Sequence, residues 1–333
     1  MRTASSWGSV IDDALPKFGT MATALIVFFA ILLIVFFVAG YASGWIAKPL
    51  TIVILLGPAA LLLIIGLVVP ALRTFLISFK DADSVKSVGG ANYSWAFTDP
   101  DIRHVLLVTL AWIVIAPVVS TSLGLLLALL IDRMKHESVA KSLIFMPVAI
   151  SFVGASIIWK FVYTWRDSSQ SQVGLLSQVM IWLGWKNPPN WLLWQPWNNL
   201  LLMVIMIWVQ TGFAMVVLSA AIKNVPGDVL EAASLDGATG FRLFRRITLP
   251  MVRGTVIVVL TTIMIAVLKI FDIVATMTGG NFGTSVLANE MYNQTFVQGD
   301  AGHGAALATI LFLGVIPLVV YNVVQLRKER SVR

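Results

Sequence analysis

Seven long apolar stretches constrain this chain more than any other feature of its sequence. An α-helix needs about 20 largely apolar residues to cross the hydrocarbon core of a membrane. Hydrophobic residues make up 58% of the 333 residues and charged residues only 12%, whereas a soluble domain carries about 25% charged residues. The sequence therefore predicts an all-α integral membrane protein with about seven transmembrane helices. The predicted spans lie near residues 21–39, 51–79, 105–131, 142–163, 200–222, 249–271 and 305–325.

The first stretch is similar to the apolar region of a signal peptide but differs from it in two respects. Two aspartates precede it, and its apolar run exceeds the usual length of about 7–15 residues. We interpret residues 1–49 as an N-terminal extension with one retained membrane helix, and residues 50–333 as a core of six helices. If the first stretch lies in the membrane interface instead, the chain has six spans and a cytoplasmic N-terminus. In the second stretch, Pro58 and Pro70 can kink or break the helix.

Basic residues orient these spans. They gather in the loops near 133–141 and 224–248 and in the C-terminal tail, whereas the loop 272–304 contains no lysine or arginine. Because cytoplasmic loops carry the excess of basic residues, the first two loops and the C-terminus are predicted to be cytoplasmic. The loops near 80–104, 164–199 and 272–304 are then external, and with seven spans the N-terminus is external too. The orientation of the chain in the membrane accounts for the net charge of +7. No nucleic-acid partner is therefore predicted.

The external loop 164–199 contains six tryptophans. An aromatic belt at the membrane surface accounts for them most simply, since tryptophan is enriched at both membrane interfaces. A docking face, or a surface on which an incoming sugar stacks, is the alternative. The six residues are Trp165, Trp182, Trp185, Trp191, Trp194 and Trp197.

No catalytic or metal-binding site is predicted. The chain has no cysteine, and its three histidines are scattered among loops without the spacing of metal ligands. The aspartates between residues 81 and 101 lie near His104 but show no recognisable catalytic spacing. No Gly-x-x-x-x-Gly-Lys-Ser/Thr motif supplies a P-loop for ATP, so the chain is predicted to be a non-enzyme that draws its energy from another polypeptide. The rival hypotheses are a membrane-embedded glycosyltransferase-like enzyme, a lipid-modifying hydrolase, and a passive channel or receptor.

The predicted cytoplasmic loop 224–250 is the most informative segment. It reads NVPGDVLEAASLDGATGFRLFRRITLP. Pro226 suits a first helical position and Gly237 suits the residue that ends a helix. A second short helix presents Phe241 and Phe244, and Pro250 marks the entry into the next span. Such a helix pair either lies on lipid headgroups or inserts into a groove of a soluble partner, and the residues alone leave both interpretations open.

Acidic, small and glycine residues follow one another in this loop in a fixed order: EAA at 231–233, DGA at 236–238, Phe244, and ITLP at 247–250. The order resembles the EAA loop of binding-protein-dependent ABC importer permeases. In that family the loop is a coupling helix seated in a cleft of the ATPase subunit. The resemblance implies that the two carboxylates hold the turn and meet the partner, and that the alanines permit close approach. The implied coupling residues are Glu231, Ala232, Ala233, Asp236, Gly237, Ala238, Phe244 and Pro250.

The resemblance extends from about residue 50 to the C-terminus. The segments MTGGNFG at 277–283, GHGAA at 302–306 and WVQTGFAM at 208–215 are similar to segments of carbohydrate-type permeases, above all of maltose-type and α-glucoside-type subunits. The extra N-terminal helix fits the larger of their two permease chains. The large external domain of some maltose permeases is absent, so the contacts assigned to that domain are not carried over.

Spans five and six contain the candidate residues of a solute path. Ionisable groups inside a span are costly and are therefore functional candidates; two of them, three residues apart at the external end of span six, can pair on one helix face. A sugar site also needs aromatic faces and hydrogen-bonding groups. Helix packing and an interfacial ion pair are the structural alternatives. The candidates are Trp208, Gln210, Thr211, Phe213, Lys269 and Asp272.

The resemblance implies a multi-pass subunit of the bacterial inner membrane, surrounded by lipid. Its implied partners are a second permease, two ATP-binding subunits and an external solute-binding protein. ATP and Mg²⁺ belong to the ATPase, whose closure would rock the coupling helices and switch the cavity between inward-facing and outward-facing states. No cofactor is expected on this chain. The implied solute is a sugar, an α-linked di- or oligosaccharide or an α-glucoside, with glycerol phosphate or a polyol as the alternative.

Overall fold

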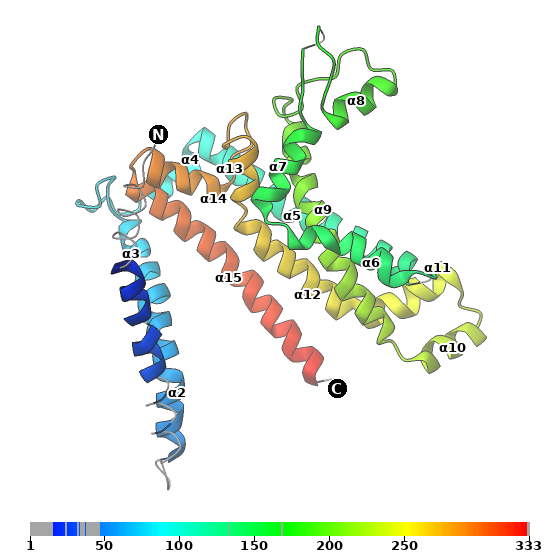
Figure 1. The fold of residues 1–333 in the computed structure, drawn as a ribbon, viewed down its shortest axis with the longest axis horizontal. Helices are drawn as coiled ribbons and strands as arrows, with labels where there is room; N and C mark the ends of the chain where they lie inside the picture. Colours follow the sequence, from blue (N-terminus) through cyan, green and yellow to red (C-terminus); the bar gives the residue numbers. More distant parts are fainter. Residues whose placement is uncertain are drawn as a thin grey trace, which may run out of the picture. The chain divides into compact units, whose positions relative to one another are not determined.

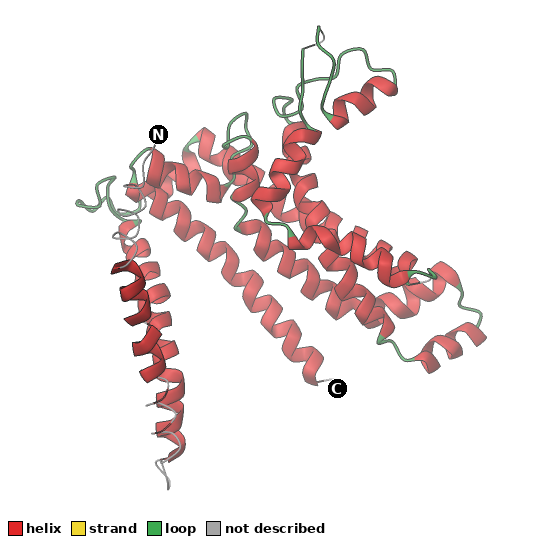
Figure 2. Ribbon diagram, viewed as in Figure 1, coloured by secondary structure: helices red, strands yellow, loops and turns green. Residues whose placement is uncertain are grey.

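The computed structural model describes residues 16–23, 25–31, 33, 37, 47–132, 134–167 and 169–331. These residues form helices and loops, with one isolated antiparallel bridge between Lys80 and Ser87 (Figure 2). The chain divides into two compact units, residues 1–73 and 74–333. The all-α prediction is therefore confirmed for the described residues.

The helices have the following bounds in chain order, where η marks a π-helical or 3₁₀ segment (Figure 1). They are α2 (Ala47–Leu63), η1 (Ile64–Val68), α3 (Val69–Ile77), α4 (Ala91–Thr98), α5 (Pro100–Ile131), α6 (Glu137–Phe145), η2 (Met146–Ala149), α7 (Phe152–Val162), α8 (Leu175–Trp182), α9 (Trp197–Lys223), α10 (Gly227–Leu235), α11 (Gly240–Leu243), η3 (Phe244–Thr248), α12 (Leu249–Leu268), α13 (Asp272–Met277), α14 (Leu287–Tyr292), η4 (Asn293–Val297) and α15 (Ala301–Ser331).

Five helical segments of the described residues are long and apolar enough to cross a membrane. They correspond to five of the predicted spans, and a sixth is possible if the bent pair formed by α6–η2 and α7 counts as one. The first predicted stretch, 21–39, lies partly outside the described residues, and its described residues up to Ile31 belong to a shorter apolar helix, Pro16–Ile31. The five segments are Leu55–Ile77, Pro100–Ile131, Trp197–Lys223, Gly240–Leu268 and Ala301–Val324.

The fourth predicted stretch, 142–163, is not one continuous helix. It contains two helices that meet at an angle of 103°. Pro147 lies in the 3₁₀ segment η2, and Ile150 and Ser151 then adopt extended backbone angles. The Ser151 hydroxyl accepts a hydrogen bond from the amide of Gly154 at 3.1 Å, which caps the start of α7. The bend therefore has a local cause, since proline breaks the helical hydrogen bonds and a new N-cap follows at once.

Two prolines follow π-helical turns at the same spacing. η1 ends two residues before Pro70, and η3 ends two residues before Pro250. A proline has no amide hydrogen, and its ring clashes with the carbonyl four residues earlier. Widening the helix by one residue relieves this clash, and π-turns of this kind occur inside otherwise regular helices. Pro250 therefore widens the helix that runs from Gly240 to Leu268 without ending it.

Small residues let α5 and α9 pack closely along each other. A Cβ atom added at Gly124 of α5 would lie 2.5 Å from the Cβ of Ala214 and 2.8 Å from the amide nitrogen of Met215. A Cβ atom at Gly212 would meet the backbone of Ile144 and Phe145 in α6. Helices in membranes associate through such small residues because lipid supplies no hydrophobic driving force between them. Around this contact lie fully buried side chains that include Trp112, Met206, Met215 and Leu218.

At the other end of the bundle from α10 and α11, the loop 278–286 is held by α5 and α9 (Figure 1). The side-chain amides of Asn198 and Asn199 donate to the carbonyls of Phe282 and Gly283, both at 2.9 Å. The amide of Leu287 donates to the hydroxyl of Thr109 at 2.8 Å.

The tryptophans of the loop 164–199 divide into two groups. Trp165 donates its indole hydrogen to the carbonyl of Pro188, and Trp191 is buried and donates to the hydroxyl of Ser177, both at 2.8 Å. These two residues shape the loop that carries α8, which projects from the bundle in Figure 1. The other four, Trp182, Trp185, Trp194 and Trp197, are exposed.

Candidate functional site

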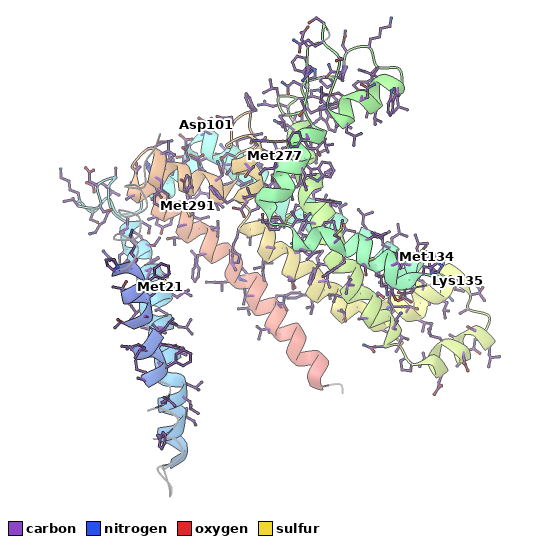
Figure 3. All side chains as sticks on the ribbon, viewed as in Figure 1. Met21, Asp101, Met134, Lys135, Met277 and Met291 are labelled. Atoms are coloured by element: carbon purple, nitrogen blue, oxygen red, sulfur yellow. The ribbon has the colours of Figure 1, made fainter. Side chains whose placement is uncertain are left out.

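The segment 224–250 lies at one end of the bundle and contains α10, α11 and η3 (Figure 1). Figure 3 shows Met134 and Lys135 near α11 at this end, and Asp101 and Met277 at the other. Basic residues such as Lys223 and Arg242 also belong to α9 and α11 at this end. Of the basic residues that oriented the chain, Arg133 and Arg333 lie outside the described residues.

Gly237 ends α10, as its sequence position predicts. Its φ angle is +83°, in the left-handed region that side chains with a Cβ atom avoid. The amide of Gly237 donates to the carbonyl of Ser234 at 3.0 Å, and that of Ala238 donates to the carbonyl of Ala233 at 2.9 Å. These two hydrogen bonds form a Schellman motif. At the other end, Pro226 precedes the first helical residue and has an extended ψ of 131°, so the prediction that it occupies that first position is wrong by one residue.

The backbone, and not the carboxylates, closes the turn after α10. The side chains of Glu231 and Asp236 are exposed and make no hydrogen bond or ion pair within the part of the chain that the structure describes. This differs from the expectation that they hold the turn. A carboxylate without a partner among the described residues can pair with a group on another subunit.

Apolar side chains of the same segment face solvent. Leu235 is 89% exposed and Phe241 is 73% exposed, and the ring of Phe241 lies 6.3 Å from that of Phe244. Among the other predicted coupling residues, Ala232 and Pro250 are exposed, Ala238 is half-buried and Ala233 is buried. Exposed apolar side chains next to polar ones mark an interaction surface.

A cluster of charged side chains lies just before this segment. The Lys141 ammonium of α6 is 2.6 Å from a carboxylate oxygen of Asp132 and 2.6 Å from one of Glu137. It also contacts the hydroxyl of Ser219 in α9, which donates to Asp132 at 2.7 Å. Lys223, in the last turn of α9, pairs with Glu137. This cluster was not predicted from the sequence, although the i,i+4 spacing of Glu137 and Lys141 is typical of a helical ion pair.

The four candidate residues of α9 point in two directions. At 100° per residue, Trp208 and Thr211 are about 60° apart, and the mean direction of Gln210 and Phe213 lies about 160° from the mean direction of the first pair. The first pair lines a groove of about 430 Å³. The structure therefore brings Trp208 and Thr211 together and separates them from Gln210 and Phe213.

The groove is mostly apolar and lies between α5, α6, α7 and α9. The ring of Trp159 packs edge-on against that of Trp208, with centroids 5.9 Å apart. The hydroxyl of Thr211 donates to the carbonyl of Ile207 at 2.7 Å. Trp159 was not among the predicted candidates, because its distance in sequence from α9 hides the contact. The lining residues are Leu123, Leu127, Leu143, Ile144, Pro147, Trp159, Val204, Ile207, Trp208 and Thr211.

Lys269 and Asp272 do not pair. α12 ends at Leu268, and Asp272 is the first residue of α13. Both side chains are exposed, and no ion pair joins them among the described residues. The prediction that they share one helix face is wrong, because the chain leaves the helix between them.

Comparison with known proteins identifies the family of the chain. The sequence profile of the family described as "Binding-protein-dependent transport system inner membrane component" matches residues 120–332, which is more than half of the chain. The chain belongs to this family. The permease is therefore a multi-pass protein of the inner membrane and a transport subunit of an ABC importer whose ATPase is a separate subunit. Members of this family are transport permease subunits without a catalytic domain, in agreement with the prediction that the chain is not an enzyme.

Two relatives cover most of the permease. It is 47% identical over 276 residues to the osmoprotective compounds uptake permease protein GgtC of Synechocystis sp., which covers 83% of this chain and 99% of the relative. It is 44% identical over 275 residues to the alpha-glucoside transport system permease protein AglF of Rhizobium meliloti, which covers 82% of each chain. Both relatives are transport permeases, as the resemblance of the 224–250 segment implied.

A solved structure shows the same fold. A chain of the bacterial alginate ABC transporter, crystallised with an alginate pentasaccharide-bound periplasmic protein, superposes with a TM-score of 0.70. The match covers 80% of the permease and 91% of that chain at 20% identity. The predicted ABC importer permease fold is confirmed.

Proposed function

We propose that the permease carries an α-glucoside or a similar small, uncharged glycoside inward across the membrane, and that a separate ATPase drives this movement through the segment 224–250. The proposed docking of the ATPase rests mainly on Leu235 of α10, which is 89% exposed. The turn that follows α10 is closed by backbone hydrogen bonds alone. Such a surface is stable without a partner and has an apolar side chain ready to enter a groove.

The residues that line the groove beside α9 support the proposal of an uncharged solute. Its lining includes two indole rings, those of Trp159 and Trp208, but no lysine or arginine. Aromatic faces bind the C–H surfaces of sugars, whereas a phosphate requires cationic or amide donors. Relatives named for osmoprotective compounds and for α-glucosides agree with this preference. One relative, 30% identical, is named for sn-glycerol-3-phosphate transport. The uptake experiment below therefore includes this anionic solute as the alternative substrate.

The remaining parts of the proposal concern orientation and partners. The end of the bundle that carries α10 and α11 is cytoplasmic, as is the C-terminus, because basic residues gather there. A second permease completes the path, two ATPase subunits bind ATP and Mg²⁺ below it, and an external binding protein delivers the solute. Trp208 and Thr211 face the solute in the groove. Gln210, Phe213, Lys269 and Asp272 are not among the residues that line the groove.

Affinity purification of the tagged permease from its native membrane tests the docking surface. We expect a P-loop ATPase and a second permease to accompany the wild-type chain, as identified by mass spectrometry. Leu235→Asp and Glu231→Lys should lose the ATPase and keep the second permease. Leu183→Asp is the matched control, because Leu183 is also a highly exposed leucine, at 71%, but lies in the loop 164–199 and not in the docking segment. Recovery of the wild-type chain alone, after cross-linking in mild detergent, would exclude the importer assembly.

Uptake of radiolabelled solutes by cells with and without the gene tests the substrate class. Trehalose or sucrose should be accumulated, and glycerol 3-phosphate should not. Trp208→Leu should lower the uptake rate about 3- to 10-fold, since an aromatic contact contributes about 0.5–1.5 kcal/mol. Gln210→Leu is the control on the opposite face of α9 and should have a smaller effect. Accumulation of glycerol 3-phosphate alone would overturn the glycoside proposal.

A further inference from the structure

The charged cluster between α6 and α9 connects three helix ends. Asp132 follows the last residue of α5, Glu137 and Lys141 belong to the first turns of α6, and Ser219 and Lys223 belong to the last turns of α9. Lys141 is the hub, because its ammonium contacts Asp132, Glu137 and Ser219 together.

The cluster is partly removed from solvent. The side chains of Lys141 and Asp132 are 18% and 13% exposed, and Glu137 is 27% exposed. Separation of α6 from α9 would cost more here than at a fully exposed ion pair, because it would leave partly buried charges without compensation. The positions of α6 and α9 are therefore fixed to each other at this point by charge as well as by packing.

α6 leads from this cluster directly into the wall of the groove. Leu143 and Ile144, which line the groove, come two and three residues after Lys141, or about 3–5 Å along the helix axis. The carbonyl of Ile144 lies against Gly212 of α9, so the wall cannot slide inward there without moving α9.

α9 leads from the same cluster directly into the proposed docking surface. Lys223 is the last residue of α9, and α10 begins four residues later at Gly227. Val225 lies between them and is buried, which leaves a short connection anchored at its centre. A displacement of α10 therefore reaches the end of α9 through only three residues, and it reaches α11 through the four residues at the other end of α10.

We propose that Lys141 is a positioning residue that passes the movement of α10 to the groove: the cluster holds the start of α6 to the end of α9, so that both move as one body when the ATPase closes. The inference rests on the proposed docking of an ATPase at α10. The cluster acts on the α6 wall and touches neither the solute nor the nucleotide.

The absence of cysteine from the chain makes a direct test possible. Leu143→Cys places one thiol on the groove wall at a residue that is 63% exposed. In the purified complex with its ATPase, reconstituted in liposomes, the rate of labelling by a small thiol reagent is measured with and without ATP. ATP should change this rate about threefold or more, a shift within the range of coupling energies in proteins.

Lys141→Met in this background should abolish the ATP-dependent change while ATP hydrolysis continues. Lys141→Arg should restore the change, because it restores the charge. Lys135→Met is the matched control, since Lys135 is exposed, lies six residues away and takes no part in the cluster. If Lys141→Met prevents folding, the double variant Asp132→Asn/Lys141→Met removes both charges and replaces it.

Two results would overturn the inference. One is an ATP-dependent change of normal size in the Lys141→Met or double variant. The other is a parallel loss of labelling change, ATP hydrolysis and ATPase copurification, which would make the cluster a stabilising feature only. Failure of the proposed function differs from both, because the wild-type chain itself would then purify without an ATPase. The thiol measurement uses no solute, so an error in the substrate class does not affect it.

Discussion

Small residues occur in two regions of the permease, and the two regions use them in opposite ways. Between α5 and α9, Gly124 is covered so closely that an added Cβ atom would lie 2.5 Å from the side chain of Ala214. At the end of α10, Gly237 has no heavy atom within 4 Å of the corresponding position. The first glycine is required by a neighbour within the chain. The second is required by the backbone angle of the turn, with open space around it.

The surroundings of the two glycines differ in the same way. Fully buried side chains such as Met206 and Met215 lie around the α5–α9 contact, whereas Leu235 and Phe241 are exposed beside α10 and α11. The packing of the described residues therefore explains the small residues of α9, whereas in α10 it covers Ala233 and leaves Ala232 exposed. Small residues on a surface that is left open among the described residues agree with the proposed close approach of a partner.

The largest effect is expected from Gly124→Leu. Its added atoms meet the backbone of Met215 as well as a side chain, and backbone cannot move aside without separating the helices. We expect destabilisation at or above the usual cost of overpacking, about 1–3 kcal/mol. The measurement is the yield and thermal unfolding midpoint of the purified chain.

Gly66→Leu is the control for this prediction. Gly66 lies in η1, and an added Cβ atom there meets nothing within 4 Å. Its yield and midpoint should match those of the wild-type chain. Equal behaviour of the two variants would show that the close approach of α5 and α9 is not needed for folding.

An intermediate effect, confined to function, is expected from Gly237→Val. A left-handed backbone conformation costs a residue with a Cβ atom about 1–2 kcal/mol, so the turn after α10 should open. The midpoint of bundle unfolding should stay unchanged, because this turn contributes nothing to the α5–α9 contact. ATPase copurification and uptake should fall together.

Gly237→Asn separates the backbone effect from the loss of a small residue. Asparagine tolerates the left-handed region better than valine does, so this variant should retain more ATPase than Gly237→Val. If both variants lose the ATPase equally, the side chain of a partner, and not the turn, sets the requirement for glycine.

The sequence predicted those features that depend on neighbouring residues along the chain. Stretch lengths gave the spans of α5, α9, α12 and α15, and the position of Gly237 gave the end of α10. The resemblance of the 224–250 segment gave the family. The prediction of one helix over 142–163 was wrong, although Pro147 and Ser151 were visible, because apolar composition outweighs a single proline in a span prediction.

Features that depend on contacts distant in sequence were missed. Lys141 meets Ser219 across 78 residues, and no periodicity in either helix indicates this contact. The division of the α9 candidates into two helix faces, by contrast, could have been predicted from the sequence. At 100° per residue, Trp208 and Gln210 lie on different faces of any α-helix. The prediction that Lys269 and Asp272 share one helix face was wrong for a third reason. The i,i+3 spacing places two residues on one face only in a continuous helix, and α12 ends at Leu268 before α13 begins at Asp272.

The smallest effect is expected at the start of α5, from Asp99→Ala. The carboxylate of Asp99 accepts hydrogen bonds from the amides of Asp101 and Ile102 at 3.0 and 3.1 Å, whereas α10 begins at Gly227, after Pro226, without a side-chain cap. Loss of an N-cap costs about 1 kcal/mol, and asparagine caps nearly as well as aspartate. Amide hydrogen exchange in the first turn of α5 should therefore rise about fivefold in Asp99→Ala and little in Asp99→Asn. Uptake should stay unchanged in both, because this cap lies at the opposite end of the bundle from α10. A loss of uptake in Asp99→Ala alone would mean that the start of α5 takes part in transport. The contrast between a bundle stabilised by its own packing and a segment proposed to bind a partner would then not hold at this end of the molecule.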